Sequence, residues 1–355
     1  LPMERYDVVI YGATGFTGAY IVRQLVMSKQ YEGLSFAVSG RNESKLQQVL
    51  DTDIVATPII IADSSDEKSM TEMAKRAKVI VNAVGPFLEK CRCCTAKRLK
   101  RRKNFDGDLN HVETFVQLKS GPLGYAINAG TYQTLILAFS ETANDGLGKI
   151  RRAIMPEKIV KGAVKPPKRG TIWHMQEKEL DTWAMPFLGS DKSIVHVETY
   201  RGVSSLFWAI MIAIWIFIFS FLVQYEFTRK ILQKYPDLCS FNTFKNSGPT
   251  EEQIAGASFV YWFFGYGYSD RKPLGEQHVG NPDQRMVVTC KGPDAGYMAT
   301  SACALSAALA LIHSENLPEG GGVFTSASAF ARTRIYSYLK SFGIVFNVET
   351  PTEPI

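Results

Sequence analysis

Cysteine and histidine are scarce in this chain and follow no metal-binding pattern. The six cysteines lie at positions 91, 93, 94, 239, 290 and 303, and only the first three are close together, as C-x-C-C. The five histidines are scattered, without the H-E-x-x-H spacing of zinc proteases. These spacings exclude a disulfide framework and a structural zinc site, and they indicate a reducing compartment. We therefore predict no metal centre.

No secretory leader is predicted, and the charge excess is small. Its first apolar stretch is short and contains Asp7, which is typical of a core strand and not of a signal peptide. The net charge of +6 over 355 residues permits attraction to anionic lipid or phosphate without requiring either. With 46% hydrophobic and 21% charged residues, the sequence predicts a folded protein with room for two domains.

A glycine-rich turn between a predicted strand, 6–11, and a predicted helix, 19–27, is the strongest motif. It consists of Gly12, Ala13, Thr14, Gly15, Phe16, Thr17 and Gly18, with the spacing G-x-x-G-x-x-G. Gly12 permits a tight turn, Gly15 lets the backbone approach a pyrophosphate, and Gly18 lets helix and strand pack closely. The free N–H groups at the helix start attract anions, so the motif predicts a dinucleotide cradle. An ordinary glycine turn is the alternative.

The end of the next predicted strand, 34–38, bears on the choice of cofactor. Ser39, Gly40 and Arg41 close this strand, and Lys45 follows one helical turn later. In Rossmann folds an acidic residue here binds the ribose of NAD, whereas an arginine accommodates the 2′-phosphate of NADP. No acid ends this strand, so we predict NADP in preference to NAD. Plain surface positions for both cations are the alternative.

Further strands and helices alternate up to Val84. Helices are predicted at 43–50 and 69–75, and strands at 57–62 and 79–84. This alternation predicts a doubly wound parallel sheet. Asp63 and the segment Val84-Gly85-Pro86 follow two of these strands, at the edge where such sheets bind ligands. We therefore add them to the candidate cofactor site.

The alternation breaks at 88–103, where six of the seven residues from 97 to 103 are basic. This cluster could be a nuclear address, an anionic-lipid patch, an RNA contact or a solvated charged loop. We expect no nucleic-acid partner. The next predicted strand begins only at His111.

Residues 206–223 form an apolar run of eighteen residues without a charge. As a helix this run is about 27 Å long, just short of a hydrocarbon core of roughly 30 Å. Trp208 and Tyr225 near its ends are typical of an interface, and cations flank both ends. The adjoining segment 225–235 has the pattern of an amphipathic interfacial helix. We predict one-sided, monotopic insertion with both globular halves in the cytoplasm; a buried core helix is the alternative.

Several motifs spread along the chain resemble the saccharopine dehydrogenase-like oxidoreductases. They are the glycine loop, Ser39-Gly40-Arg41, Val84-Gly85-Pro86, 186–191, Gly248-Pro249-Thr250, 263–268, Lys291-Gly292-Pro293, Ala295-Gly296-Tyr297 and 320–325. The resemblance implies a Rossmann domain, a second α+β domain on a mixed sheet, and a C-terminal helix that packs back on the first domain. It also implies lipid-droplet or membrane association and lipid metabolism; some bacterial relatives are trans-acting enoyl reductases of glycolipid synthesis.

The chain departs from this family after Phe87. Two further strand–helix units, with a Gly-Glu-Pro stretch and a Gly-Phe-Asp-Ser-x-Pro stretch, are absent, and the basic segment replaces them. We therefore predict a lipid-associated oxidoreductase-like protein that lacks an internal block, with lost catalysis and a lipid-droplet scaffold role as the alternative. No catalytic residue is assigned; Asp191, His196 and Tyr200 are candidates by residue type alone.

The predicted organisation has four parts and leaves a homo-oligomer open. The parts are a Rossmann-like domain at 1–103, a second domain at 104–202, a membrane-inserting segment at 203–224, and the remainder of the second domain with a return helix at 225–355.

Overall fold

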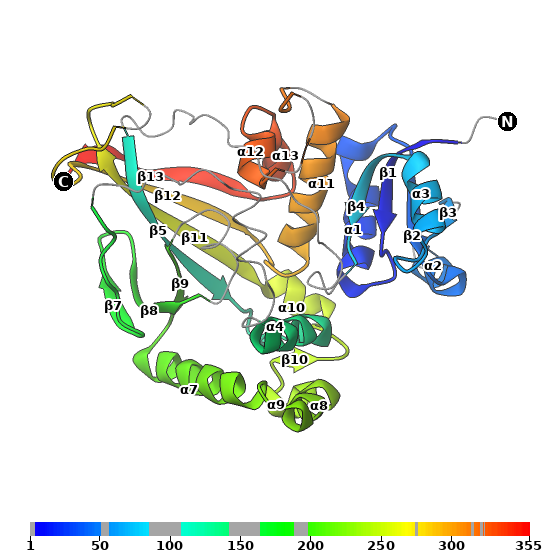
Figure 1. The fold of residues 1–355 in the computed structure, drawn as a ribbon, viewed down its shortest axis with the longest axis horizontal. Helices are drawn as coiled ribbons and strands as arrows, with labels where there is room; N and C mark the ends of the chain where they lie inside the picture. Colours follow the sequence, from blue (N-terminus) through cyan, green and yellow to red (C-terminus); the bar gives the residue numbers. More distant parts are fainter. Residues whose placement is uncertain are drawn as a thin grey trace.

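The computed structural model describes residues 4–50, 57–84, 108–141, 164–187, 198–273, 276–313, 316–319, 322 and 324–355. These residues form two main sheets that lie on either side of helix α11 (Figure 1). The predicted boundary between 103 and 104 lies outside the described residues and stays a prediction.

The N-terminal sheet is a small parallel sheet covered by helices. Its strands are β1 (Tyr6–Tyr11), β2 (Phe36–Gly40), β3 (Ile59–Ile61) and β4 (Ala77–Asn82), in the order β3-β2-β1-β4. The helices are α1 (Phe16–Met27), α2 (Glu43–Leu50), α3 (Glu67–Lys75) and a 3-10 turn, η1 (Lys29–Tyr31). Val8, Val9 and Ile10 are completely buried because both faces of β1 are covered. The prediction of a Rossmann-like parallel sheet is confirmed.

The second sheet has seven described strands and is mixed. The strands are β5 (Asp108–Lys119), β7 (Trp173–Gln176), β8 (Asp181–Pro186), β9 (Glu198–Val203), β11 (Ser258–Tyr268), β12 (Gln284–Pro293) and β13 (Val345–Pro354). Their order is β13-β12-β11-β5-β9-β8-β7, and β5 and β9 are its parallel pair. Two short strands, β6 (Ile127–Asn128) and β10 (Phe244–Lys245), pair separately. The prediction of a second sheet of mixed type is thereby confirmed.

Strand β11 continues to Tyr268 because β5 and β12 bond it on both edges. Phe241 and Asn242 adopt φ angles of 51° and 60°, which no strand tolerates, so β10 begins only at Phe244.

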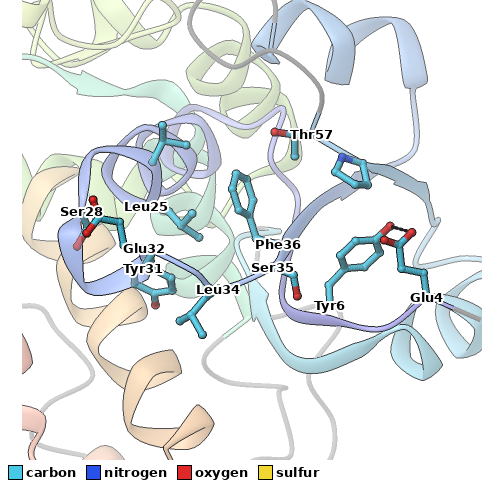
Figure 2. Close-up of a pocket in the computed structure, with 12 residues that line it drawn as sticks. Glu4, Tyr6, Leu25, Ser28, Tyr31, Glu32, Leu34, Ser35, Phe36 and Thr57 are labelled. Atoms are coloured by element: carbon cyan, nitrogen blue, oxygen red, sulfur yellow. Dashed lines mark hydrogen bonds between the residues drawn. The ribbon is translucent and has the colours of Figure 1, made fainter.

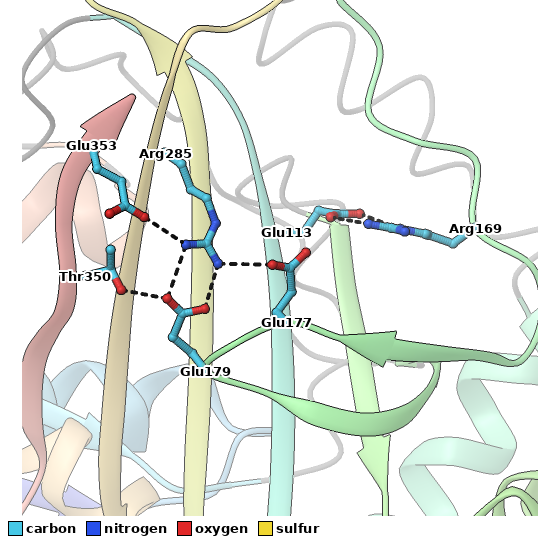
Figure 3. A network of polar contacts seen from close by, with 7 residues as sticks. All are labelled: Glu113, Arg169, Glu177, Glu179, Arg285, Thr350 and Glu353. Carbon is cyan, nitrogen blue, oxygen red and sulfur yellow. Dashed lines mark hydrogen bonds and ion pairs between the residues drawn. The ribbon is translucent and has the colours of Figure 1, made fainter. Parts of the chain in front are cut away.

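A network of ion pairs holds the β7–β8 hairpin across the second sheet (Figure 3). On β12, Arg285 contacts Glu179 at 2.7 Å and Glu177 at 3.3 Å, both from the hairpin turn. The hydroxyl of Thr350 on β13 donates to Glu179 at 2.7 Å, and Glu353 contacts Arg285 at 3.3 Å. We call these five residues the hairpin clasp. It ties one edge of the sheet to strands near the other edge.

Helix α11 (Met298–Ile312) belongs to the cores of both halves. Its residues Leu305, Ala308 and Leu309 are buried with Ile10 and Val22 of the first half. Toward its N-terminus, Ala299 and Ala302 are buried with residues of the second sheet. Helices α12 (Ser326–Phe330) and α13 (Ile335–Ser341) follow, and the chain ends in β13. The helix that returns to the first domain is therefore α11, and the C-terminal element is a strand.

Helices α4 (Ala129–Glu141), α7 (Leu206–Leu222), α8 (Glu226–Lys234), α9 (Pro236–Cys239) and α10 (Glu251–Gly256) complete the second half. In Figure 1, α7, α8 and α9 lie together along the lower side of the molecule. Across the described residues, no helix combines the length and apolarity needed to cross a bilayer.

Candidate dinucleotide cradle and the exposed apolar face

The glycine loop follows β1 and contacts the ends of two neighbouring strands, β2 and β4. Gly12 has a φ of +89°, a conformation that side chains disfavour, and its N–H donates to the carbonyl of Ser39 at 2.8 Å. A Cβ at Gly12 would lie 2.7 Å from Cγ2 of Val84, which follows β4. The loop after β1 therefore lies directly against the ends of β2 and β4, the edge where parallel sheets bind nucleotides.

The helix start after the loop is open to a ligand. A Cβ at Gly18 would lie 2.2 Å from the carbonyl oxygen of Gly12, so only glycine lets α1 pack this close to the loop. Gly15 is the N-cap of α1, and among the described residues this helix start has no side-chain cap hydrogen bond. Thr14 and Gly15 are exposed, whereas Ala13 is buried. This arrangement fits a pyrophosphate at the helix N-terminus.

The residues after β2 flank the cradle. Ser39 and Gly40 are buried, and the hydroxyl of Ser39 has no hydrogen-bond partner in the described part of the chain. Arg41 and Lys45 are exposed, and Asn42 accepts from the backbone N–H of Lys45 at 3.0 Å. Both cations are thus accessible to an anionic group near the end of β2.

Not every predicted residue has a place in the cradle. Asp63 accepts from the N–H and the hydroxyl of Ser65, at 2.9 and 2.8 Å, so this carboxylate stabilises the turn after β3. Phe16 and Thr17 are half-buried, and the ring of Phe16 packs on Tyr297 of the second half. Gly85 and Pro86 lie outside the described residues.

A hollow of about 470 Å³ lies at the opposite edge of the N-terminal sheet (Figure 2). Its lining residues come from the starts of β1, β2 and β3, from the last turn of α1 and from the region that follows α1. Among them the hydroxyl of Tyr6 donates to Glu4 at 2.8 Å. Because nucleotides bind at the carboxyl ends of such strands, this hollow is not the dinucleotide site.

Of the three residues proposed by type, only Tyr200 is described; Asp191 and His196 lie outside the described residues. The ring of Tyr200 packs edge-on against Trp173, with 4.5 Å between the ring centres, and lies tilted against Phe115 at 5.3 Å. Burial raises the pKa of its hydroxyl to about 12, which disfavours a role as a base at neutral pH. Tyr200 is a core residue.

Sequence reasoning missed a buried ion pair beside Tyr200. Glu113 on β5 is completely buried and accepts two hydrogen bonds from Arg169, at 3.1 and 2.9 Å. The hydrogen bonds that Arg169 donates to Glu113 hold the pKa of Arg169 above its ordinary value. The alternation of β5 puts Glu113 on the same face as Phe115, and the only available signal was a charge within an apolar strand.

Helix α7 is apolar on two sides, and only one of them is covered. Its inner side packs Ala209 against Met185 and Val203, and Phe219 against Tyr132 and Val223. Its outer side exposes 63% of Phe207, 76% of Phe217 and 60% of Phe221. We call the outer side, together with its continuation on α8 and α9, the apolar face. Its exposed members are Leu206, Phe207, Trp208, Ile210, Met211, Ile214, Phe217, Ile218, Phe221, Tyr225, Phe227, Ile231, Tyr235, Leu238 and Phe241.

A parallel sheet with an open, glycine-lined helix start at its carboxyl edge defines a Rossmann-type dinucleotide-binding protein. Residues 8–99 match the family model described as the saccharopine dehydrogenase NADP-binding domain. The chain is 49% identical to a lipid droplet localized protein of Caenorhabditis elegans, covering 98% of this chain and 99% of the worm protein. It is 30% identical to a saccharopine dehydrogenase-like oxidoreductase of Rattus norvegicus, covering 98% of each.

A probable mitochondrial saccharopine dehydrogenase-like oxidoreductase of Arabidopsis thaliana is 25% identical, over 98% of this chain and 97% of the plant protein. The chain therefore belongs to the saccharopine dehydrogenase-like oxidoreductase family, and its N-terminal domain is of the nicotinamide dinucleotide-binding type. The alignment with the worm protein spans 422 positions against 355 residues here, so at least 67 positions have no counterpart in this chain.

Proposed function

We propose that this chain is an NADP-binding, oxidoreductase-like protein that acts in lipid metabolism while attached to a lipid monolayer. The single observation that supports the attachment is the apolar face, because a helix without a polar side needs a second apolar environment. The lipid-droplet name of the worm relative points the same way. Glycolipids are one class of lipid on which such a protein could act.

In this proposal the first turn of α1 binds the pyrophosphate, and Arg41, with Lys45 beside it, binds the 2′-phosphate. Bound NADPH would supply a hydride, and the residues of this chain would bind and orient it. The exposure of both cations and the open N-terminus of α1 support these roles.

The attachment is one-sided. Helix α11 comes after α7 in the chain and is buried with residues of the first sheet, which supports a placement of the segments before and after α7 on the same side of the lipid. The apolar face has bulky aromatic residues, and on α8 it is bordered by three cations, Arg229, Lys230 and Lys234, of which Lys230 is paired with Glu226 at 2.7 Å. The exposed aromatic residues of α7, a helix without a charge, favour the exposed hydrocarbon of a monolayer over neutral lipid.

The lipid test compares flotation of the purified chain with triacylglycerol droplets coated by phosphatidylcholine and with vesicles of phosphatidylserine. We expect binding to the droplets that survives 0.5 M salt, because apolar insertion is not screened. Substituting Phe207, Phe217 and Phe221 by serine should abolish it. The matched control carries serine at Met27, Leu123 and Val279, which are exposed by 77%, 64% and 92% elsewhere. Equal loss in both variants, or salt-sensitive binding to vesicles alone, contradicts the proposal.

The cofactor test is titration calorimetry with NADPH and NADH. We expect tighter binding of NADPH, and Arg41→Ala should remove about tenfold of this preference, because charge-assisted bonds to phosphate contribute roughly 1.5 kcal/mol. NADH binding as tightly as NADPH would overturn the role of Arg41, and failure of both to bind would overturn the cofactor assignment.

A non-catalytic scaffold on the lipid droplet is the second candidate, and the alignment gap of at least 67 positions favours it. We propose that the gap lies after Phe87, where the family motifs are missing. The test is Gly15→Val in cells that lack the endogenous chain. If the chain is a scaffold, this variant should restore the normal lipid content of the cells without binding NADPH. If the chain is an enzyme, the variant should reach the droplets and leave the lipid content unrestored.

A further inference from the structure

Phe16 is part of the glycine loop, yet its ring points to the second half of the protein. The ring lies 4.7 Å from that of Tyr297, edge-on at 63°, and 5.5 Å from that of Tyr20. It thus belongs to an aromatic cluster between α1 and the start of α11, together with Ile254 of α10. A side chain one residue from the open N-cap of α1 is therefore held by a distant part of the chain.

Gly248 lies against the Phe16 ring as well. We call Gly248 and Tyr297, which both contact this ring, the seat of Phe16. Gly248 is buried, with a φ of +71°, and an added Cβ would lie 2.6 and 2.7 Å from two ring carbons of Phe16. Contacts this short force one partner to move. Glycine at 248 is consequently required twice, by the backbone conformation and by the ring that lies against it.

Tyr297 is itself fixed by hydrogen bonds. Its N–H donates to Oδ2 of Asp294 at 2.6 Å, and its hydroxyl accepts from the N–H of Asn128 at 2.8 Å. Asp294 is 1% exposed and also accepts from the hydroxyl of Tyr125. The seat is therefore rigid, whereas the nearby ion pair of Arg23 and Glu251, at 2.8 Å, is solvent-exposed and contributes little.

We propose that Gly248 and Tyr297 are positioning residues for the dinucleotide. By seating Phe16 they fix the loop from Gly12 to Gly18, so that the N–H groups at the start of α1 meet the pyrophosphate without a further ordering cost. This inference rests on the proposed dinucleotide function. It assigns part of the binding energy to the second half of the chain.

The experiment compares the NADPH affinity of Gly248→Ala with that of Gly33→Ala. Gly33 has a similar φ of +80° but nothing within 4 Å of an added Cβ, so it isolates backbone strain from the clash with Phe16. We expect Gly248→Ala to bind NADPH about tenfold more weakly and Gly33→Ala to bind like the wild type. Unchanged binding in Gly248→Ala, or equal weakening in both variants, overturns the proposal.

A double variant tests whether removing the Phe16 ring cancels the effect of Gly248→Ala on NADPH binding. Phe16→Ala removes the ring atoms that meet the added Cβ, so Phe16→Ala/Gly248→Ala should bind no more weakly than Phe16→Ala alone. Additive losses would show that position 248 acts by another route, and would overturn the seat.

Hydrogen exchange without cofactor separates this inference from the cofactor assignment. Amides 13–18 should exchange faster in Gly248→Ala and not in Gly33→Ala, while melting temperatures report the stability of each variant. Faster exchange in a chain that binds no NADPH would leave the seat standing and refute the dinucleotide function. Unchanged exchange refutes the seat even where NADPH binds.

Discussion

Helices α7 and α11 are similar in composition and opposite in surroundings. Both lack charged residues, and they have 17 and 15 residues. The chain covers α11 on two sides, so Leu305 and Leu309 are completely buried. It covers α7 on one side, where only Ala209 and Phe219 are buried. Apolar composition thus marks a need for an apolar environment, and only the packing tells whether the protein or a lipid supplies it.

The sharpest way to break this comparison is to put the same charge on each helix. Leu309→Asp should prevent folding, because an unpaired carboxylate in the core costs more than about 4 kcal/mol. Phe217→Asp should change the free energy of unfolding by less than about 0.5 kcal/mol, because this ring is 76% exposed. Urea unfolding measures both. A large loss of stability in Phe217→Asp would mean that the protein itself covers the apolar face.

Acid should lower the stability of the second half of the protein, because low pH protonates a carboxylate of the hairpin clasp. Arg285 holds the pKa of Glu179 at about 2, below the ordinary 4.5. This ion pair stabilises the fold above pH 4.5, and the stability is lost as the pH falls from 4.5 toward 2, by at most roughly 3 kcal/mol. Glu179→Gln should flatten that part of the pH profile of unfolding.

Asp7 is the matched group in the other half. Lys78 holds its pKa at about 2, so Asp7→Asn should flatten the same pH window. Digestion with pepsin at pH 3 distinguishes the two halves. In Glu179→Gln the clasp is lost, so pepsin should cut the hairpin, residues 173–186, before it cuts α11. First cuts within α11 in this variant would contradict the assignment.

A small loss of stability is expected from a change at the start of α7. The hydroxyl of Ser205 accepts from the N–H of Trp208 at 3.4 Å and caps the helix. Ser205→Ala should lower the free energy of unfolding by about 0.5–1 kcal/mol, measured by urea unfolding. Ser205→Asp should retain most of this free energy of unfolding. A loss greater than about 1 kcal/mol in Ser205→Ala would show that the serine does more than cap the helix.

Local features were predictable and distant pairings were not. The glycine loop and the limits of α7, expected at 206–223 and found at Leu206–Leu222, depend on adjacent residues. The β7–β8 hairpin was missed because its clasp joins Glu179 to a residue 106 positions away. The direction of Phe16 likewise depends on Gly248 and Tyr297, which no local pattern connects to the loop. Sequence therefore located the cradle but not its support.

Because α11 completes the core of the first sheet, the order of synthesis matters. The strands and helices of that sheet are made by Asn82, yet Leu305, Ala308 and Leu309 leave the ribosome more than two hundred residues later. At roughly 5–20 residues per second, the apolar side of α1 and β1 waits on the order of tens of seconds for its cover. The nascent chain consequently exposes apolar surface throughout this time. We therefore expect its production in cells to require chaperones that bind nascent chains.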